Sequence, residues 1–185
     1  MEIQFIKNTA LFRGMSEDEV LSALKVLQAV ERQYKKDDIV FYAGDTTDRM
    51  GLVLSGSVTI ESNDAWGNRT ILSHVGRGHF FAETYALFKD EPLLVDVRAN
   101  EKSTILFLRS INIQTPMNQS APWAIKYMTN ILMISARKNL MLSGRSFHTA
   151  PKTIRGRVLS YLNSDRKSTR LNSSHPTTSR MPSSA

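Results

Sequence analysis

Between Asp38 and Arg109 the sequence is a series of short β-rich runs separated by turn residues, and no other feature constrains the fold as strongly. The runs are DIVFYAG (38–44), MGLVLSGSVTIES (50–62), NRTILSHV (68–75), LLVDVRAN (93–100) and STILFLR (103–109). Branched and aromatic residues favour extended backbone, while Gly, Asn and Asp favour tight turns. The glycines expected at turns that a Cβ would obstruct are Gly44, Gly56, Gly76 and Gly78. Many short strands at close spacing predict a small antiparallel barrel or roll.

A short helix is expected before these strands. Ser16 and Glu19 have the spacing of a capping box, with Ser16 as the N-cap and Glu19 as N3. The apolar residues that follow at helical spacing are Val20, Leu21, Leu24 and Leu27. The pattern predicts one amphipathic helix.

A longer helix, over Trp123–Leu142, is predicted after the strands. One stripe along it consists of Ile125, Met128, Leu132, Ser135, Asn139 and Leu142. A neighbouring stripe consists of Tyr127, Ile131, Ile134 and Met141. Two such faces need two partners. We expect one face to pack on the β-roll and the other on the same helix of a second subunit, with Asn139 fixing the register. The alternative is a helix packed between elements of its own domain.

The sequence changes character after this helix. A hinge-like segment SGRSFHTAP (143–151) precedes KTIRGRVLSYLN (152–163), which opens another amphipathic helix. Residues 165–185 contain nine Ser and Thr among 21 residues, so they cannot build a core and are expected to be disordered. DRKSTRLNSSH and SRMPSSA in this tail also resemble a translated sequencing-library adapter, so we expect the tail to be an artefact.

The amino-acid composition excludes several kinds of site and shows where the charge lies. The chain has no cysteine, which excludes disulfides, thiolate zinc sites, cysteine-ligated clusters and cysteine nucleophiles within it. Its net charge of +7 is unevenly placed: residues 1–110 hold 13 basic and 16 acidic residues, whereas residues 111–165 hold seven and one. The body is therefore mildly acidic. Neither a secretion signal nor a membrane-spanning run is present, so we expect a cytoplasmic protein with no membrane partner.

Three segments along these elements are distinctive: FYAGDTTDRMGLVLSGSVTI (41–60), GRGHFFAETYALF (76–88) and KTIRGRVLSYL (152–162). Together with the order of the elements, they resemble the cyclic-AMP receptor protein and fumarate-nitrate regulator (Crp/Fnr) superfamily of transcription regulators. The resemblance implies a mainly β fold with some α structure: a jelly-roll-like antiparallel β-roll of the cyclic-nucleotide-binding type, a long C-terminal dimerisation helix, and a winged helix-turn-helix that binds DNA.

The resemblance also implies a domain organisation. Residues 1–115 would form the effector domain, 116–147 the dimerisation helix and hinge, 148–164 the start of the helix-turn-helix domain, and 165–185 the tail. A winged helix needs roughly 60 residues, and only its first helix precedes the tail. We therefore expect this chain to sense an effector and to form a homodimer. DNA binding is expected of the intact regulator but not of this fragment, and no cofactor is predicted.

The effector pocket implied by the resemblance is altered here. In the family's cyclic-nucleotide binders a Gly-Glu pair contacts the ribose and an Arg-Ser pair about ten residues later holds the phosphate. Ala82-Glu83, between Phe81 and Thr84, matches the first pair imperfectly, because Ala does not tolerate the positive φ open to Gly. Leu93-Leu94 replaces the second pair, so the guanidinium that clamps an anion is missing. The corresponding contact from the long helix is Leu142-Ser143 in place of two hydroxyl residues. We expect no tight binding of cyclic AMP, and either a more apolar effector or none.

Simpler interpretations of the same residues stay open. Glu83 can serve as a turn or helix cap, and Leu93 and Leu94 can be core residues. Arg98 is the nearest remaining cation, but strand alternation places it on the opposite face from Leu93. The arginines expected to be solvated on strand faces are Arg77, Arg98 and Arg109. The residues that can contact DNA phosphates in an intact regulator, or simply form a solvated helix face, are Lys152, Arg155 and Arg157.

Two other classes of function compete. His79 and Glu83, with His74 before them, resemble half of a cupin metal site, but the His-x-His pair of such a site is absent. An ordinary turn histidine is the simpler interpretation, so we expect no enzyme activity and no metal. The other alternative is a β-roll that has lost its ligand and acts only as an interaction and dimerisation module.

Overall fold

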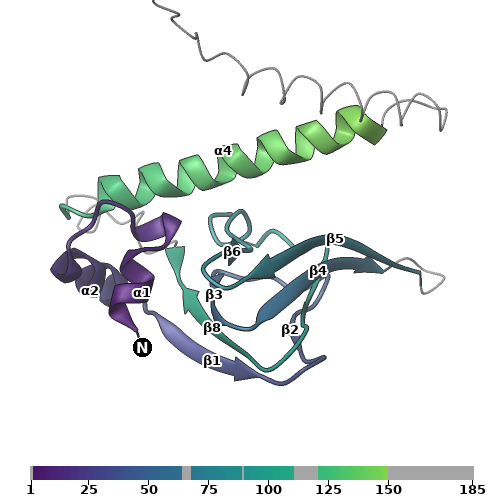
Figure 1. Cartoon of the computed structure of the whole chain (residues 1–185), viewed down its shortest axis with the longest axis horizontal. Helices are drawn as coiled ribbons and strands as arrows, with labels where there is room; N and C mark the ends of the chain where they lie inside the picture. Colours follow the sequence, from purple (N-terminus) through teal and green to yellow (C-terminus); the bar gives the residue numbers. More distant parts are fainter. Residues whose placement is uncertain (1, 64–67, 89, 111–120, 150–185) are drawn as a thin grey trace, which may run out of the picture. The chain divides into compact units, whose positions relative to one another are not determined.

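Eight strands form two antiparallel sheets (Figure 1). The computed structural model describes residues 2–63, 68–88, 90–110 and 121–149. The strands are β1 (Val30–Tyr34), β2 (Ile39–Phe41), β3 (Met50–Ser55), β4 (Ser57–Asn63), β5 (Arg69–Gly76), β6 (Phe80–Phe81), β7 (Asp96–Ala99) and β8 (Ser103–Leu108). The first sheet has the order β1-β8-β3-β6 and the second has the order β2-β7-β4-β5. The predicted antiparallel roll is confirmed.

Two strands were missed by the sequence patterns. Strand β1, VERQY, has four exposed residues in succession and therefore lacks the alternation of a half-buried strand. It is held by pairing with β8 over its whole length, from Val30 opposite Phe107 to Tyr34 opposite Ser103. Strand β6 is two residues long and has no period to detect. Both strands are fixed by partners that lie far away in the sequence.

The described helices are α1 (Ile3–Lys7), the 3-10 helix η1 (Ala10–Phe12), α2 (Glu17–Val26) and α4 (Ala124–Thr149). The capping box of α2 is confirmed: the Glu19 backbone N–H donates to Ser16 Oγ at 3.2 Å, and the Ser16 N–H donates to the Glu19 carboxylate at 2.7 Å. Val20, Leu24 and Leu27 are buried as expected, but Leu21 is exposed. Helix α1 was not anticipated.

The central strands β3 and β8 of the sheet β1-β8-β3-β6 are buried on both faces, whereas β1 is largely exposed. Alternate residues of β3 and β8 point to opposite sides, so Leu52 and Leu106 join one apolar cluster while Val53 and Ile105 join another. The first cluster, which we call the helix-side core, includes the apolar residues of α1, η1, α2 and the start of α4. The second, the roll interior, lies between the two sheets. This double burial explains the nearly continuous apolar sequence MGLVL in β3.

The glycine expectations hold at three of four positions. Gly44, Gly56 and Gly78 have φ between +76° and +90°, the left-handed region that favours glycine. A Cβ on Gly56 would also meet the Ser103 side chain. Gly76 has open space around it and no positive φ, so the expectation was wrong there.

Helix α4 begins as predicted but continues through the segment expected to be a hinge, as far as Thr149. Gly144 does not end it, because a glycine costs a helix only about 1 kcal/mol relative to alanine. The chain divides into two units, Met1–Ala136 and Arg137–Ala185. The predicted boundaries at 115, 147 and 164 stay predictions, and the segments 152–163 and 165–185 lie outside the described residues.

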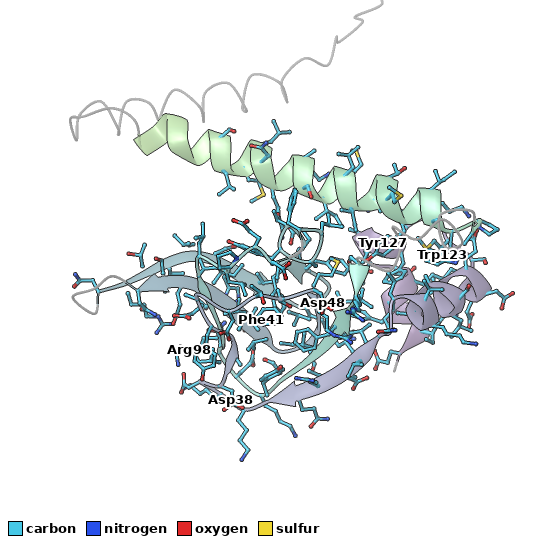
Figure 2. All side chains as sticks on the ribbon, turned by 180° about the vertical axis from the view of Figure 1, so that it is seen from behind. Asp38, Phe41, Asp48, Arg98, Trp123 and Tyr127 are labelled. Atoms are coloured by element: carbon cyan, nitrogen blue, oxygen red, sulfur yellow. The ribbon has the colours of Figure 1, made fainter. Side chains whose placement is uncertain are left out.

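The first turns of α4 are anchored to the N-terminal helices. Trp123 Nε1 donates to Ser22 Oγ at 3.2 Å, and Lys126 Nζ lies 2.7 Å from the Glu19 carboxylate. Trp123 and Tyr127 are buried side chains at this end of the helix (Figure 2). No helix among the described residues is long and apolar enough to cross a membrane.

Candidate functional site

The turn Phe81–Thr84 follows β6 and places the predicted effector residues at the rim of the roll interior. Phe81 is fully buried in that interior, and Ala82 packs partly against it. Ala82 has φ of +59°, so the expectation that alanine would not take this conformation was wrong. The left-handed region costs a non-glycine residue about 1–2 kcal/mol, and the packing on both sides of the turn offsets that cost. The fold therefore keeps the left-handed backbone even without a glycine.

Glu83 and Thr84 differ in exposure. Glu83 is only 6% exposed, so its carboxylate is not a solvated surface acid, whereas Thr84 is exposed. The chain continues in a further turn, in which the Ala86 N–H donates to the Ala82 carbonyl at 3.0 Å. Whether Glu83 caps this turn or contacts an effector stays open.

The adjacent leucines Leu93 and Leu94 have different environments. Leu93 is 2% exposed, and its backbone is fixed by hydrogen bonds with Gly44 at 2.7 Å and Asp45 at 2.8 Å. Leu94 is 74% exposed, and its N–H donates to the Tyr85 hydroxyl at 3.3 Å. The core interpretation is therefore correct for Leu93 and wrong for Leu94. An apolar side chain stands at each position where the resemblance calls for Arg and Ser.

Arg98 does not supply the missing cation, because it is held on the outer face of its sheet. Val97 faces the roll interior, so its neighbour Arg98 faces outward. Arg98 Nε donates to Glu61 at 3.0 Å and its Nη1 donates to the Asp37 carbonyl at 3.0 Å. Glu61 is fully buried and also lies 2.5 Å from Arg69. Arg98 therefore lies on a strand face as expected, but it is half-buried and paired rather than freely solvated.

Arg77 and Arg109 are likewise paired. Arg77 stacks on the Phe5 ring, with 4.1 Å from its guanidinium carbon to the ring centroid, and lies 3.1 Å from the Glu2 carboxylate. Arg109 Nε lies 2.5 Å from Asp48. Sequence alone missed these partners because each lies tens of residues away along the chain.

Aromatic rings fill much of the roll interior. Phe41 contacts Phe81 and Phe107 edge-on, at centroid distances of 5.9 and 5.6 Å, and Phe107 contacts Tyr34 at 6.3 Å. Such edge-to-face contacts favour a fixed arrangement of the rings. Phe41 was not singled out from the sequence, although the first motif above begins with it.

The fold is shared with known proteins. Residues 31–120 match the family model described as the cyclic nucleotide-binding domain. The cyclic AMP receptor protein of Thermus thermophilus is 33% identical over 86 residues, which cover 46% of this chain but only 39% of that protein. The crystal structure of Thermus thermophilus catabolite activator protein aligns with a TM-score of 0.59 and 26% identity, covering 76% of this chain and 64% of that one.

A domain structure supports the same fold. The N-terminal domain of a transcriptional regulator from Streptomyces coelicolor aligns with a TM-score of 0.59 and 21% identity, covering 73% of this chain and 94% of that domain. The chain carries a cyclic nucleotide-binding domain of the Crp/Fnr type. That the turn at Ala82 and the segment at Leu93 of this Crp/Fnr-type domain form an altered effector pocket stays a prediction from the resemblance.

The two stripes of α4 differ in exposure over its first turns. On one stripe Tyr127 and Ile131 are buried in the helix-side core, where the Tyr127 hydroxyl lies 3.0 Å from Ser110 Oγ. On the other stripe Ile125, Met128 and Leu132 are exposed by 73%, 51% and 67%. Ser135 is half-buried and Asn139 is exposed. The first turns of the Tyr127 stripe therefore pack within the chain's own domain as expected, Ile134 packs partly against the same core, and Met141 further along is 65% exposed. The partner of the other stripe stays a prediction.

Several predicted residues are not tested by the structure. Leu142 and Ser143 are exposed residues of α4 in the second unit, so their part in the effector pocket stays a prediction. The predicted phosphate-contacting residues Lys152, Arg155 and Arg157 lie outside the described residues.

The histidines considered for a metal site have other neighbours. His74 Nδ1 lies 3.3 Å from Asn100, and His79 Nδ1 lies 3.2 Å from the Arg77 carbonyl. Among residues 2–63, 68–88, 90–110 and 121–149, no three His, Asp or Glu side chains are grouped so as to hold a metal ion.

Proposed function

We propose that this chain is the effector-sensing and dimerising part of a Crp/Fnr-type transcription regulator, and that its effector is not cyclic AMP. The proposal rests on the two leucines that stand where the resemblance calls for Arg and Ser. Leu93 is buried and Leu94 is exposed, and neither carries a charge. DNA binding belongs in this proposal to the intact regulator, through a helix-turn-helix that would begin with the segment 152–163.

The energetic argument concerns the cyclic phosphate. An anion that leaves water needs a charge-assisted partner, and losing one member of such a pair costs about 2–5 kcal/mol. A loss of about 4 kcal/mol weakens binding about a thousandfold. Arg98 cannot compensate without giving up Glu61, and its side chain is on the outer face.

Calorimetric titration of the chain with cyclic AMP tests this proposal. We expect no saturable heat below about 100 μM, since a thousandfold loss from a 0.1 μM site gives that value. The double variant Leu93→Arg and Leu94→Ser should tighten binding at least about tenfold, while Leu72→Arg, which adds the same charge elsewhere, should not. Submicromolar binding of cyclic AMP by the unmodified chain would refute the proposal.

Dimerisation is proposed from the exposed stripe of α4. Ile125, Met128 and Leu132 expose apolar surface along one face of a helix whose opposite face is already buried. Leu132→Glu should convert a dimer into a monomer in sedimentation equilibrium. Met133→Glu is the matched control, because Met133 is also exposed but lies about 100° around the helix from Leu132. Equal effects of the two changes would argue against this face.

A second candidate is favoured by the packed roll interior. Edge-to-face contacts among Phe41, Phe81 and Phe107 are what a module without a ligand would need to stay ordered. A thermal-shift screen separates the two functions, since an effector must raise the melting temperature with its concentration by mass action. Saturating shifts would support the sensor, and a flat screen would support the interaction module.

A further inference from the structure

A groove of about 320 Å³ lies at the end of the helix-side core, away from the effector turn. Its walls come from α1, from the neighbouring strands β1, β8 and β3, and from the residue that follows β5. Figure 1 shows α1 beside the start of β1. None of the predicted effector residues lines this groove, so what it binds does not depend on the proposed function. Its volume is at the lower end of the range for ligand sites, roughly 300–1,000 Å³, which limits the ligand to a small molecule.

One wall of the groove carries a fixed positive charge. The Arg77 guanidinium stacks on Phe5, its Nε donates to the Leu54 carbonyl at 2.9 Å, and its Nη2 donates to Glu2 at 3.1 Å. These bonds use two of its five N–H groups and hold its plane in place. The remaining N–H groups of Arg77 can donate to both oxygens of a carboxylate, in the two-pronged geometry that guanidinium favours.

The opposite charge comes from Glu31. Strand alternation places Glu31 on the face of the sheet that bears Leu106, its cross-strand partner in the helix-side core. Among the described residues, the Glu31 carboxylate has neither an ion pair nor a hydrogen bond. The hydroxyls of Ser55 and Thr104, which face each other across β3 and β8, are equally unpaired in this part of the chain. Three polar side chains that no protein group satisfies therefore line one groove.

We infer that this groove binds a small zwitterion of the α-amino acid class. The ligand ammonium pairs with Glu31 and its carboxylate with Arg77, while an apolar side chain lies against Phe5 and Leu54. The hydroxyls of Ser55 and Thr104 can take up the remaining polar atoms of the ligand. A simple anion would form an ion pair only with Arg77, whose charge Glu2 already neutralises in part. A simple amine would form an ion pair only with Glu31. A ligand with both charges uses both walls.

Binding would also fix the start of the chain. Glu2 and Phe5 both contact Arg77, so a ligand that binds Arg77 should change the contacts that hold α1 in place. The amide signals of α1 and of the paired strands β3 and β8 should therefore respond together.

Two-dimensional ¹H–¹⁵N spectra of the full chain, titrated with leucine, butylamine and butyrate, test the inference. We expect saturable shifts of the amides of Phe5, Leu54 and Thr104 with leucine, and at least about tenfold weaker binding of the two singly charged probes. Glu31→Gln should weaken leucine binding about tenfold or more without changing the melting temperature, because Glu31 is exposed and unpaired.

Glu91→Gln removes an exposed carboxylate outside the groove and should leave the titration unchanged. If leucine up to about 10 mM produces no saturable shift at the groove, or if Glu31→Gln binds it as well as the parent chain does, the inference is wrong. Butylamine binding as tight as leucine binding would equally overturn the zwitterion assignment. Tight binding of cyclic AMP or absence of dimerisation, which would refute the proposed function, has no bearing on this test, so the two failures are distinguishable.

Discussion

Replacing Glu61 by Gln should destabilise the effector domain by about 2 kcal/mol. Glu61 lies on β4 with 0% of its side chain exposed, although it points away from the roll interior. Its carboxylate lies 3.0 Å from Arg98 Nε and 2.5 Å from Arg69 Nη2. The two arginine side chains cover it, joining β7 and β5 to β4. An amide of the same shape would keep the packing but leave two like charges facing a neutral group.

The magnitude follows from the exposures of the three side chains. Breaking a fully buried ion pair costs about 3–5 kcal/mol, whereas exposed pairs contribute about 0–1 kcal/mol. Arg98 is 29% exposed and Arg69 is 47% exposed, so water solvates both cations partly once Glu61 is neutral. The cost should fall between these limits, and about 2 kcal/mol corresponds to a fall in melting temperature of about 8 °C for a domain of this size.

Urea denaturation followed by circular dichroism would measure the change in unfolding free energy. A double-mutant cycle with Arg98→Gln isolates the pair, and we expect a coupling energy of at least about 1 kcal/mol. Glu91→Gln is the control, because an exposed carboxylate without an ion pair in the described part of the chain should change stability by less than about 0.5 kcal/mol. High salt should remove only part of the effect, because Glu61 itself is shielded from ions.

Two results would refute this reasoning. If Glu61→Gln leaves the unfolding free energy within about 0.5 kcal/mol of the parent, the burial of Glu61 is not stabilised by its arginines. If the cycle shows no coupling, Arg98 is held by the Asp37 carbonyl alone. In that case Arg98 would also be available to other partners, and the argument that it cannot serve an effector would fail.

Three further predictions concern the turn and the base of α4. Tyr127→Phe should lower the free energy of unfolding measured in urea by about 1 kcal/mol, because it removes a buried hydrogen bond. An unchanged free energy would mean that the hydroxyl makes no net contribution to stability. Ala82→Gly should be less destabilising than Ala86→Gly by at least about 1 kcal/mol, since only the former relieves a positive φ, and equal losses would contradict the strain at that turn. The hydrogen bond from Lys126 lowers the pKa of Glu19 below its ordinary value. Glu19 therefore stabilises the fold at a pH above that ordinary value, and this contribution disappears as the pH falls through the lowered pKa. Glu19→Gln should therefore flatten the acid side of a melting-temperature curve, and an unchanged slope between neutral and acid pH would count against the bridge.

Among the regular elements, the sequence predicted those whose signal is local. The capping box at Ser16 and the strand runs between Asp38 and Arg109 rest on residues within a few positions of one another. The two stripes of α4 follow from a helical period. The structure buries Tyr127 and Ile131 of one stripe and exposes Ile125, Met128 and Leu132 of the other, but Met141 at the far end of the first stripe is exposed. Strand β1 escaped detection because its polar sequence carries no period, and only its pairing with β8 makes it a strand.

The candidate site divides in the same way. That Leu93 and Leu94 carry no cation is visible in the sequence, because it is a property of residue type. That one leucine is buried and the other exposed, that Ala82 takes a left-handed conformation, and that Arg98 is bound by a glutamate 37 residues away depend on tertiary contacts. Residue type and short-range period determined which elements form and which charge the site lacks. Only the packing of the two sheets decided where each side chain points and what it pairs with, because such contacts join residues that no local pattern connects.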